Sequence, residues 1–146
     1  MKDGVVIGGG TGTFTVLSAL KKYPLHLSAI VSMADDGGST GMLRDQYGVL
    51  PPGDVRRALV ALSDSESILR ELFGYRFKEG GLHDHNFGNL FLAALEKITG
   101  DFTLALREAS IILNVNGEVV PVTLDDVRLY AELEDGKILR GETQID

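Results

Sequence analysis

The sequence contains no cysteine. Without thiols the chain can form neither a disulfide framework nor a thiolate metal site. No stretch reaches the ~18 consecutive apolar residues of a membrane-spanning helix, and the N-terminal segment MKDGVVIGGGTG lacks the apolar core of a signal peptide. These absences predict a cytoplasmic protein that does not insert into a membrane.

Clusters of basic residues are also scarce. The formal net charge is −7, and among the 14 basic residues only Lys21-Lys22 and Arg56-Arg57 are adjacent. Because affinity for nucleic-acid backbones comes from clustered Lys and Arg, this distribution argues against a nucleic-acid binder. A small anionic ligand is still compatible with the charge, since backbone dipoles can bind an anion locally.

Glycine, by contrast, is abundant. The 18 glycines gather in short loops between apolar runs, in a chain of 146 residues that is 44% hydrophobic and fits one domain. Such loops indicate either backbone that approaches a ligand closely or simply a topology rich in turns.

The first 40 residues follow a recognisable order. An apolar run at 4–7 meets a glycine cluster at 8–12, and apolar positions 14, 17 and 20 then recur at helical spacing until Pro24. A second apolar run at 27–33 precedes Asp35-Asp36-Gly37-Gly38. Strand, glycine turn, helix and strand predict a βαβ unit with a right-handed crossover and parallel pairing.

The later pattern adds helices and then strands. Residues 39–54 show little periodicity and predict a long loop, after which Asp54 is expected to cap a helix over 55–62. Further helices are expected over 67–73 and 89–95, and after a cap at Asp101. Segments 118–122, 127–133 and 137–140 favour strands, the last two joined at a hairpin turn, Asp135-Gly136.

Together these elements predict the α/β class: a Rossmann-like three-layer fold with a mainly parallel sheet, plus a β-hairpin near the C-terminal end. We expect a single nucleotide-binding domain over residues 1–146, with βα units over 1–117 and a β-hairpin region over 118–146. Because the chain stops directly after a strand-like segment, we also expect it to be an N-terminal fragment.

The glycine cluster is the main candidate for ligand binding. Glycine permits a sharp turn with positive φ and leaves backbone N–H groups open to a phosphate at the N-terminus of the next helix. The predicted nucleotide-binding residues are Gly8, Gly9, Gly10, Thr11, Gly12 and Thr13. Thr13 stands where a dinucleotide fingerprint has its third glycine or alanine, and no P-loop lysine follows. The alternative is a turn that binds nothing.

Two acidic residues, Asp35 and Asp36, follow the second predicted strand. An acidic residue at this position can accept a hydrogen bond from a ribose hydroxyl. Two carboxylates could instead coordinate Mg²⁺, the candidate cofactor, which prefers oxygen ligands. A solvated Asp-Asp-Gly turn is the alternative without function.

Two further segments contain candidate ligand-binding residues. Arg56 and Arg57, after Pro51-Pro52-Gly53-Asp54, are suited equally to ligand phosphates and to the surface. The pair His83 and His85 is a weak metal signal, so we predict instead that His85 or Asn89 hydrogen-bonds a ligand. Asn89 also suits a routine helix cap.

Four segments in this order resemble the gluconeogenesis-factor (YvcK-like) family, within the superfamily of the CofD-like 2-phospho-lactate transferases. They are VVIGGGTGTFTVLSALKKYP, IVSMADDGGSTGMLR, LPPGDVRRALVALSD and HDHNFGNLFLAALEKITGDF. The resemblance covers essentially the whole chain, and ILNVNGEVVPVTLDDVRLYAELEDG also fits it. It implies a cytoplasmic protein that binds UDP-sugars and supports cell shape and growth on gluconeogenic carbon sources, in a chain about twice as long.

The resemblance also assigns roles to residues. It implies that Gly9–Gly12 holds the nucleotide phosphates, that Asp35 and Asp36 face the ligand, and that Asn89 is the asparagine of a Gly-Asn helix start. Thr13-Phe14 and the Asp84 and Asn86 of HDHNFGN depart from the family pattern, which leaves the choice of sugar open.

Three functions follow as alternatives. The first is a nucleotide-sugar-binding regulatory protein without turnover, since no nucleophile-base pair stands out. The second is a Mg²⁺-dependent transferase that moves a phospholactyl-like group from a nucleotide-activated donor, with Asp35 and Asp36 holding the metal. The third, an NAD-dependent oxidoreductase, fits the glycine pattern least. The sequence leaves the oligomeric state open, with a homo-oligomer among the alternatives.

Overall fold

The computed structural model describes residues 1–145, and Asp146 lies outside the described residues. The strands are β1 (Lys2–Gly8), β2 (Leu25–Val31), β3 (Glu118–Pro121), β4 (Tyr130–Glu132) and β5 (Ile138–Arg140). The helices are α1 (Gly10–Leu20), α2 (Gly38–Tyr47), α3 (Gly53–Leu62), α4 (Ser67–Gly74), α5 (Phe87–Thr99), α6 (Phe102–Ile112) and α7 (Glu142–Ile145), with a 3₁₀ turn, η1, at Gly80–Leu82.

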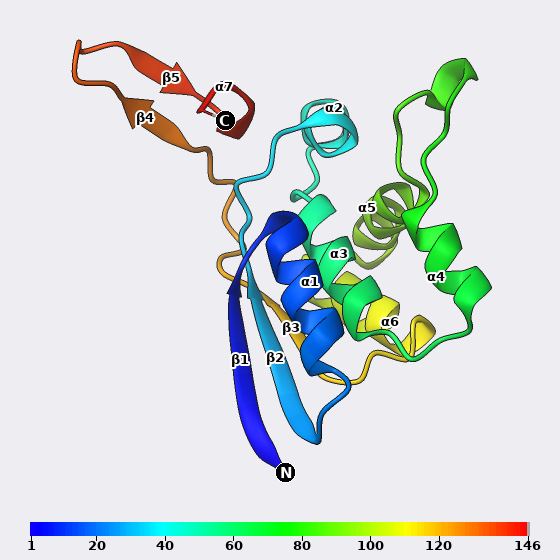
Figure 1. Cartoon of the computed structure of the whole chain (residues 1–146). Coiled ribbons are helices and arrows are strands. Elements are labelled where there is room, and N and C mark those ends of the chain that lie inside the picture. The colour runs from blue at the N-terminus through cyan, green and yellow to red at the C-terminus, as the bar shows by residue number, and fades with distance from the viewer. Residues whose placement is uncertain (146) are drawn as a thin grey trace.

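The strands β1, β2 and β3 form a parallel sheet in that order. Gly8 pairs with Val31, which pairs in turn with Pro121, so the carboxyl ends of all three strands lie at one edge. The N-terminus of α1 and the whole of α2 lie at this edge (Figure 1). The predicted α/β fold with a parallel sheet and a hairpin near the C-terminus is therefore confirmed.

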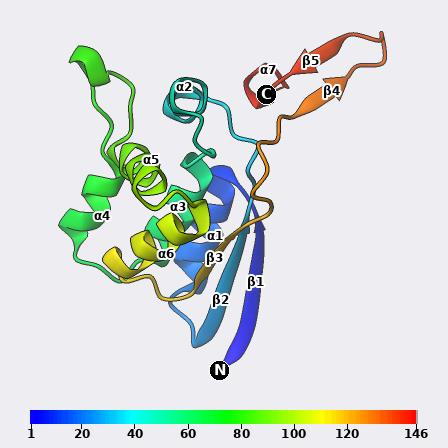
Figure 2. The ribbon, with the colours of Figure 1, turned by 180° about the vertical axis from the view of Figure 1, so that it is seen from behind.

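One face of the sheet packs against α1 and α3, with Leu27, Ala29 and Val31 of β2 fully buried between them. The helices α5 and α6 form a further layer beyond α3, as the view from behind also shows (Figure 2). The opposite face of the sheet is apolar and exposed, since Val5 is 59% and Ile7 is 74% exposed.

The helix α6 follows its sequence pattern closely. The Oδ1 atom of Asp101 accepts a hydrogen bond from the Leu104 amide at 2.9 Å, which is the predicted N-cap. The apolar residues spaced three or four apart all face the core, and they are Phe102, Ala105, Leu106, Ala109 and Leu113.

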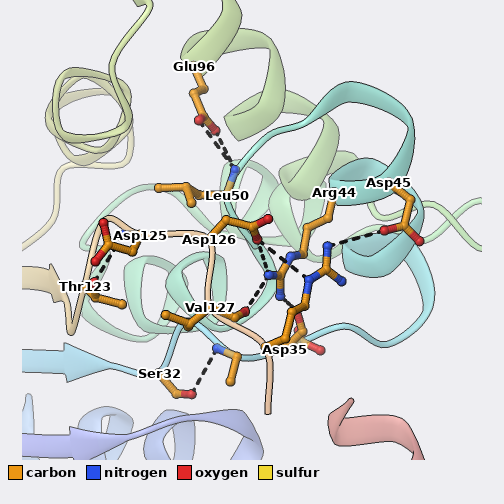
Figure 3. Close-up of polar contacts among 12 residues, drawn as sticks. Ser32, Asp35, Arg44, Asp45, Leu50, Glu96, Thr123, Asp125, Asp126 and Val127 are labelled. Atoms are coloured by element: carbon orange, nitrogen blue, oxygen red, sulfur yellow. Dashed lines mark hydrogen bonds and ion pairs between the residues drawn. The ribbon is translucent and has the colours of Figure 1, made fainter. Parts of the chain in front are cut away.

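The predicted long loop over 39–54 is wrong, because residues 38–47 form α2. The buried side of α2 includes Ser39, Thr40 and Arg44 as well as Leu43, so burial there does not follow hydrophobicity. Gly48, with φ of 64°, ends the helix in the left-handed conformation. Beyond it, the Glu96 carboxylate of α5 accepts a hydrogen bond from the Leu50 amide at 3.2 Å (Figure 3).

Two more local predictions need correction. Asp54 does not cap α3, whose N-cap is Pro52; Asp54 lies inside the first turn and its carboxylate contacts α1. The predicted strand over 127–133 shortens to β4, because the Val127 carbonyl instead accepts a hydrogen bond from Arg44 at 2.6 Å. The predicted hairpin is confirmed: β4 and β5 pair in antiparallel fashion and extend away from the sheet (Figure 1).

None of the helices formed by residues 1–145 has the length and apolar character needed to cross a membrane.

Candidate functional site

The glycine turn joins the carboxyl end of β1 to α1. Gly9 is the N-cap of α1, and Gly10 has φ of 66°, which favours glycine. A Cβ built on Gly9 would lie 2.5 Å from Asp54 Oδ2. Glycine at 9 and 10 is therefore required both by backbone conformation and by the closeness of α3.

The two threonines of the turn have different surroundings. The Thr13 hydroxyl donates to the Gly9 carbonyl at 3.1 Å and is nearly buried, so it stabilises the turn itself. Thr11 is exposed and lines a cavity, and a Cβ built on Gly12 would meet no atom within 4 Å. The open part of the turn is thus the first helical turn at Thr11 and Gly12.

A cavity of about 390 Å³ lies beside this turn. It brings together residues from α1, the loop after β2, α3 and α7. Its lining consists of Gly10, Thr11, Asp35, Gly37, Asp54, Arg57, Glu142 and Thr143. Three carboxylates and one guanidinium therefore face the same space.

Asp54 holds the glycine turn against α3. Its Oδ1 atom accepts hydrogen bonds from the Gly10 amide at 3.0 Å and from Arg57 at 2.8 Å. Burial raises the pKa of Asp54 above 3.8, the Gly10 hydrogen bond opposes this, and the nearby Asp35 carboxylate adds to the rise. Sequence reasoning missed this role because an Asp at a helix start is also typical of a cap.

The two predicted acidic residues point to different partners. Asp35 lines the cavity and accepts a hydrogen bond from the Gly37 amide at 3.0 Å. Asp36 accepts hydrogen bonds from the Thr143 amide at 3.1 Å and its hydroxyl at 2.7 Å, which joins it to α7. Burial raises the pKa of Asp36, but the Thr143 hydrogen bonds and nearby arginines outweigh it and leave the pKa below 3.8.

The geometry favours Asp35 with Asp54, rather than Asp35 with Asp36, as a carboxylate pair for a metal ion. Both line the cavity and lie close enough to influence each other electrostatically. Among residues 1–145, no group of three or more His, Asp or Glu side chains is arranged to hold a metal ion. Mg²⁺ usually binds through one or two carboxylates and completes its shell with water and ligand phosphates, which fits this pair.

Arg44 fixes the position of the acidic loop (Figure 3). It is 3% exposed and donates to the Asp35 carbonyl at 2.9 Å, to the Asp126 carboxylate and to the Val127 carbonyl at 2.6 Å. One buried guanidinium thus ties the loop after β2 to the segment before β4. No local sequence pattern indicates this contact, which spans 83 residues.

The histidine segment does not form a metal pair. His83 is exposed and its Nδ1 atom lies 3.1 Å from the Asp84 carboxylate. His85 is buried, with Nδ1 3.2 Å from the Ser39 hydroxyl, which also accepts a hydrogen bond from the Asn86 amide. Ser39 is buried, and among the described residues its hydroxyl proton has no acceptor other than His85 Nδ1, so we assign the imidazole proton to Nε2.

Asn89 contacts Arg56 and is not the cap of α5. The cap is Asn86, whose side chain accepts from the Asn89 amide at 3.1 Å. The Asn89 Oδ1 atom accepts a hydrogen bond from Arg56 Nε at 2.9 Å. Arg56 is therefore a buried residue, whereas Arg57 lines the cavity beside the glycine turn.

The structure brings together two sets of predicted site residues. Gly10, Thr11 and Asp35 line the cavity, while His85 and Asn89 belong to a hydrogen-bonded group at the start of α5. Asp36 belongs to neither set, because its carboxylate is bound by Thr143. A separate hollow of about 510 Å³ between α1, α3 and α4 contains none of the predicted residues.

The fold and this site define an α/β protein of Rossmann-like architecture, with a glycine turn and acidic side chains at the carboxyl end of a parallel sheet. Residues 5–146 match the family model described as 2-phospho-L-lactate transferase CofD. The chain belongs to this family.

Its similarity to individual proteins extends over nearly the whole chain. It is 50% identical over 145 residues to the gluconeogenesis factor of Halalkalibacterium halodurans and 49% identical over 141 residues to that of Bacillus subtilis, covering 99% and 96% of this chain. The crystal structure of a Bacillus halodurans protein superposes with a TM-score of 0.95 at 49% identity, covering 99% of this chain and 47% of that one.

The chain spans between 31% and 45% of the length of the curated relatives it matches.

Proposed function

We propose that this protein binds a nucleotide sugar of the UDP-sugar type, with the diphosphate at the glycine turn. The observation that carries the proposal is the open first turn of α1, where Thr11 and Gly12 face solvent at the carboxyl edge of the sheet. The first amides of an α-helix have no carbonyl partner within the helix, so they are available to a phosphate. The Gly10 amide is already bound by Asp54, which directs the diphosphate to the next two amides.

The charges of the cavity support a divalent cation as part of this binding. Asp35, Asp54 and Glu142 face the same space as Arg57, and Arg57 is paired with Asp54. A diphosphate brought beside these carboxylates would be repelled unless a cation lay between them. Mg²⁺ between the carboxylates and the phosphates removes that repulsion, so we expect chelation by EDTA to weaken nucleotide binding.

The cellular role that we propose follows the similarity to gluconeogenesis factors. A nucleotide-sugar-binding protein of the cytoplasm would report the supply of activated sugars. This role would connect it to growth on gluconeogenic carbon sources and to cell shape.

A bulky residue at Gly12 tests the proposed position of the diphosphate. A side chain at Gly12 enters open space, so Gly12→Leu should fold normally while its side chain covers the exposed amides. We expect at least a tenfold loss of affinity for UDP-glucose, about 1.4 kcal/mol or more, measured by titration calorimetry with Mg²⁺.

The matched control is Gly81→Leu, which also enters open space but lies in η1, away from the turn. It should bind UDP-glucose as the wild type does. Equal affinity in Gly12→Leu and the wild type would exclude the glycine turn as the diphosphate site.

A second candidate function is group transfer from a nucleotide-activated donor. The family model is described as a transferase, and the Asp35–Asp54 pair at the cavity suits a catalytic Mg²⁺. An Asp35→Asn variant whose metal-dependent product formation falls much further than its nucleotide affinity would support this function. A wild-type protein that forms no product from a panel of activated donors and acceptors would rule it out.

A further inference from the structure

Arg56 is a buried cation that forms no ion pair with a carboxylate of residues 1–145. It is 8% exposed, and no carboxylate of residues 1–145 lies within salt-bridge distance of its guanidinium. The adjacent Asp54 pairs with Arg57 instead. Burial lowers the pKa of Arg56 to about 10, the nearby Arg57 and Arg76 add to this effect, and the Asp54 and Asp35 carboxylates oppose it. A buried charge is costly unless it is paired, so a ligand anion would complete this environment.

The start of α5 is shaped around this side chain. A Cβ built on Gly88 would lie 2.6 Å from Arg56 Cδ, so glycine at 88 makes the space that Arg56 occupies. The Arg56 Nε atom donates to Asn89 Oδ1 at 2.9 Å, which fixes the orientation of the guanidinium. This contact occupies Nε and leaves the hydrogens of the two terminal nitrogens available to a ligand.

Two neighbouring side chains offer further hydrogen-bond donors. Because Asn89 Oδ1 is occupied by Arg56, the Asn89 amide group presents its Nδ2 hydrogens. The assignment of the His85 proton to Nε2 makes that nitrogen a donor as well. His85 and Asn89 flank the N-terminus of α5, whose dipole also favours an anion.

These donors lack hydrogen-bond partners within the described chain but remain accessible to solvent. Within the described chain, the terminal nitrogens of Arg56, Asn89 Nδ2 and His85 Nε2 have no hydrogen-bond acceptor. The one side-chain nitrogen there that is both sealed from solvent and unpartnered is Arg44 Nε. The three donor groups therefore each reach solvent-accessible surface.

We propose that Arg56, Asn89 and His85 form an oxyanion subsite that binds a phosphate or carboxylate group of the ligand. The subsite lies at the start of α5 and is distinct from the cavity at the glycine turn, which Arg56 does not line. Because the subsite is taken to bind part of the same nucleotide ligand, this inference rests on the proposed function. The oxyanion is either one phosphate of a diphosphate whose other phosphate lies at the glycine turn, or a further acidic group on the transferred or recognised moiety.

The test compares wild type, Arg56→Gln and the control Arg70→Gln, which alters an arginine of the separate hollow on α4. Each protein is titrated with inorganic phosphate, UDP-glucose and UDP-glucuronate. Calorimetry gives affinities, the His85 Nε2–H resonance reports contact at the subsite, and thermal unfolding verifies that each variant is folded.

We expect phosphate to shift the His85 resonance in the wild type and in Arg70→Gln but not in Arg56→Gln. Arg56→Gln should also weaken nucleotide binding at least about tenfold. An equal loss for both UDP-sugars identifies one phosphate of the diphosphate as the bound oxyanion, whereas a loss confined to UDP-glucuronate identifies a further acidic group.

If UDP-sugars bind wild type and Arg56→Gln equally and phosphate leaves His85 unchanged in both, the subsite is refuted and the nucleotide function stands. If neither UDP-sugar binds but phosphate shifts His85 only when Arg56 is present, the subsite stands and the nucleotide function is refuted.

Discussion

At the scale of single residues, the site depends on buried charges that contact distant parts of the chain. Arg44 binds the carbonyl of Asp35 and the carboxylate of Asp126, which are far apart in sequence. Asp54 likewise connects α3 to the glycine turn at Gly10. These contacts set the position of the acidic loop relative to the turn, and so set the width of the cavity between them.

The contact between Arg44 and Asp126 predicts a specific pH dependence. The hydrogen bond from Arg44 outweighs burial and lowers the pKa of Asp126 below 3.8. A lowered folded pKa contributes stability above the ordinary value, and this contribution is lost as the pH falls through the lower, folded value. Asp126→Asn should therefore lose less stability than the wild type between about pH 6 and about pH 3, measured by urea unfolding.

Asp125→Asn is the matched control at the neighbouring position, and it should keep the pH dependence of the wild type. An Asp126→Asn profile parallel to that of the wild type would show that the Arg44 contact does not form in solution.

Residue roles at the site were predictable only where they follow from the backbone. The positive φ of Gly10 and the exposure of Thr11 follow from a strand-turn-helix pattern, which the sequence displays. The hydrogen bond from the Gly10 amide to Asp54 and the burial of Arg56 against Asn89 depend on partners 44 and 33 residues away. Local patterns carry no information about such partners.

At the scale of elements, the helices differ in what stabilises them. The helix α6 was predictable because it has an N-cap and a regular apolar stripe. The helix α2 was missed because its buried side includes Ser39, Thr40 and Arg44, whose burial is satisfied by contacts to other elements. A helix held by polar tertiary contacts has no hydrophobic period to detect.

Removal of the N-cap side chain should destabilise the protein more at α5 than at α6. Asp101→Ala removes one exposed cap and should lower the free energy of unfolding by about 1 kcal/mol. Asn86 is 1% exposed and also donates to the Gly74 carbonyl at 3.0 Å, so Asn86→Ala leaves further buried groups unpaired. We expect that variant to lose at least about 2 kcal/mol in urea unfolding. Equal losses would mean that the buried amide contacts of Asn86 add nothing to stability.

At the scale of the whole molecule, the core lies on one side of the sheet. The side chains of β2 that face α1 and α3 are fully buried, whereas Val5 and Ile7 on the other face are open. The order of strands and helices made the parallel sheet predictable from sequence. The exposure of one face of the sheet was not predictable. An apolar run such as Gly4–Ile7 has the same sequence pattern whether one or both faces of its strand are covered.

This asymmetry predicts unequal effects of truncating apolar residues. Leu59 of α3 is fully buried, so Leu59→Ala should cost about 2–5 kcal/mol through lost contacts and a cavity. Ile7→Ala on the open face should change the free energy of unfolding by no more than about 0.5 kcal/mol. Urea unfolding of both variants measures the difference. A large loss in Ile7→Ala would contradict an exposed face.

The central claim is that the open first turn of α1 binds the diphosphate of a nucleotide sugar. A crystal structure of the protein with UDP-N-acetylglucosamine and Mg²⁺ tests it most directly. We predict diphosphate density against the amides of Thr11 and Gly12, with Mg²⁺ between the phosphates and the carboxylates of Asp35 and Asp54. Nucleotide bound in the hollow between α1, α3 and α4, or a glycine turn left empty at saturating ligand, would contradict the claim.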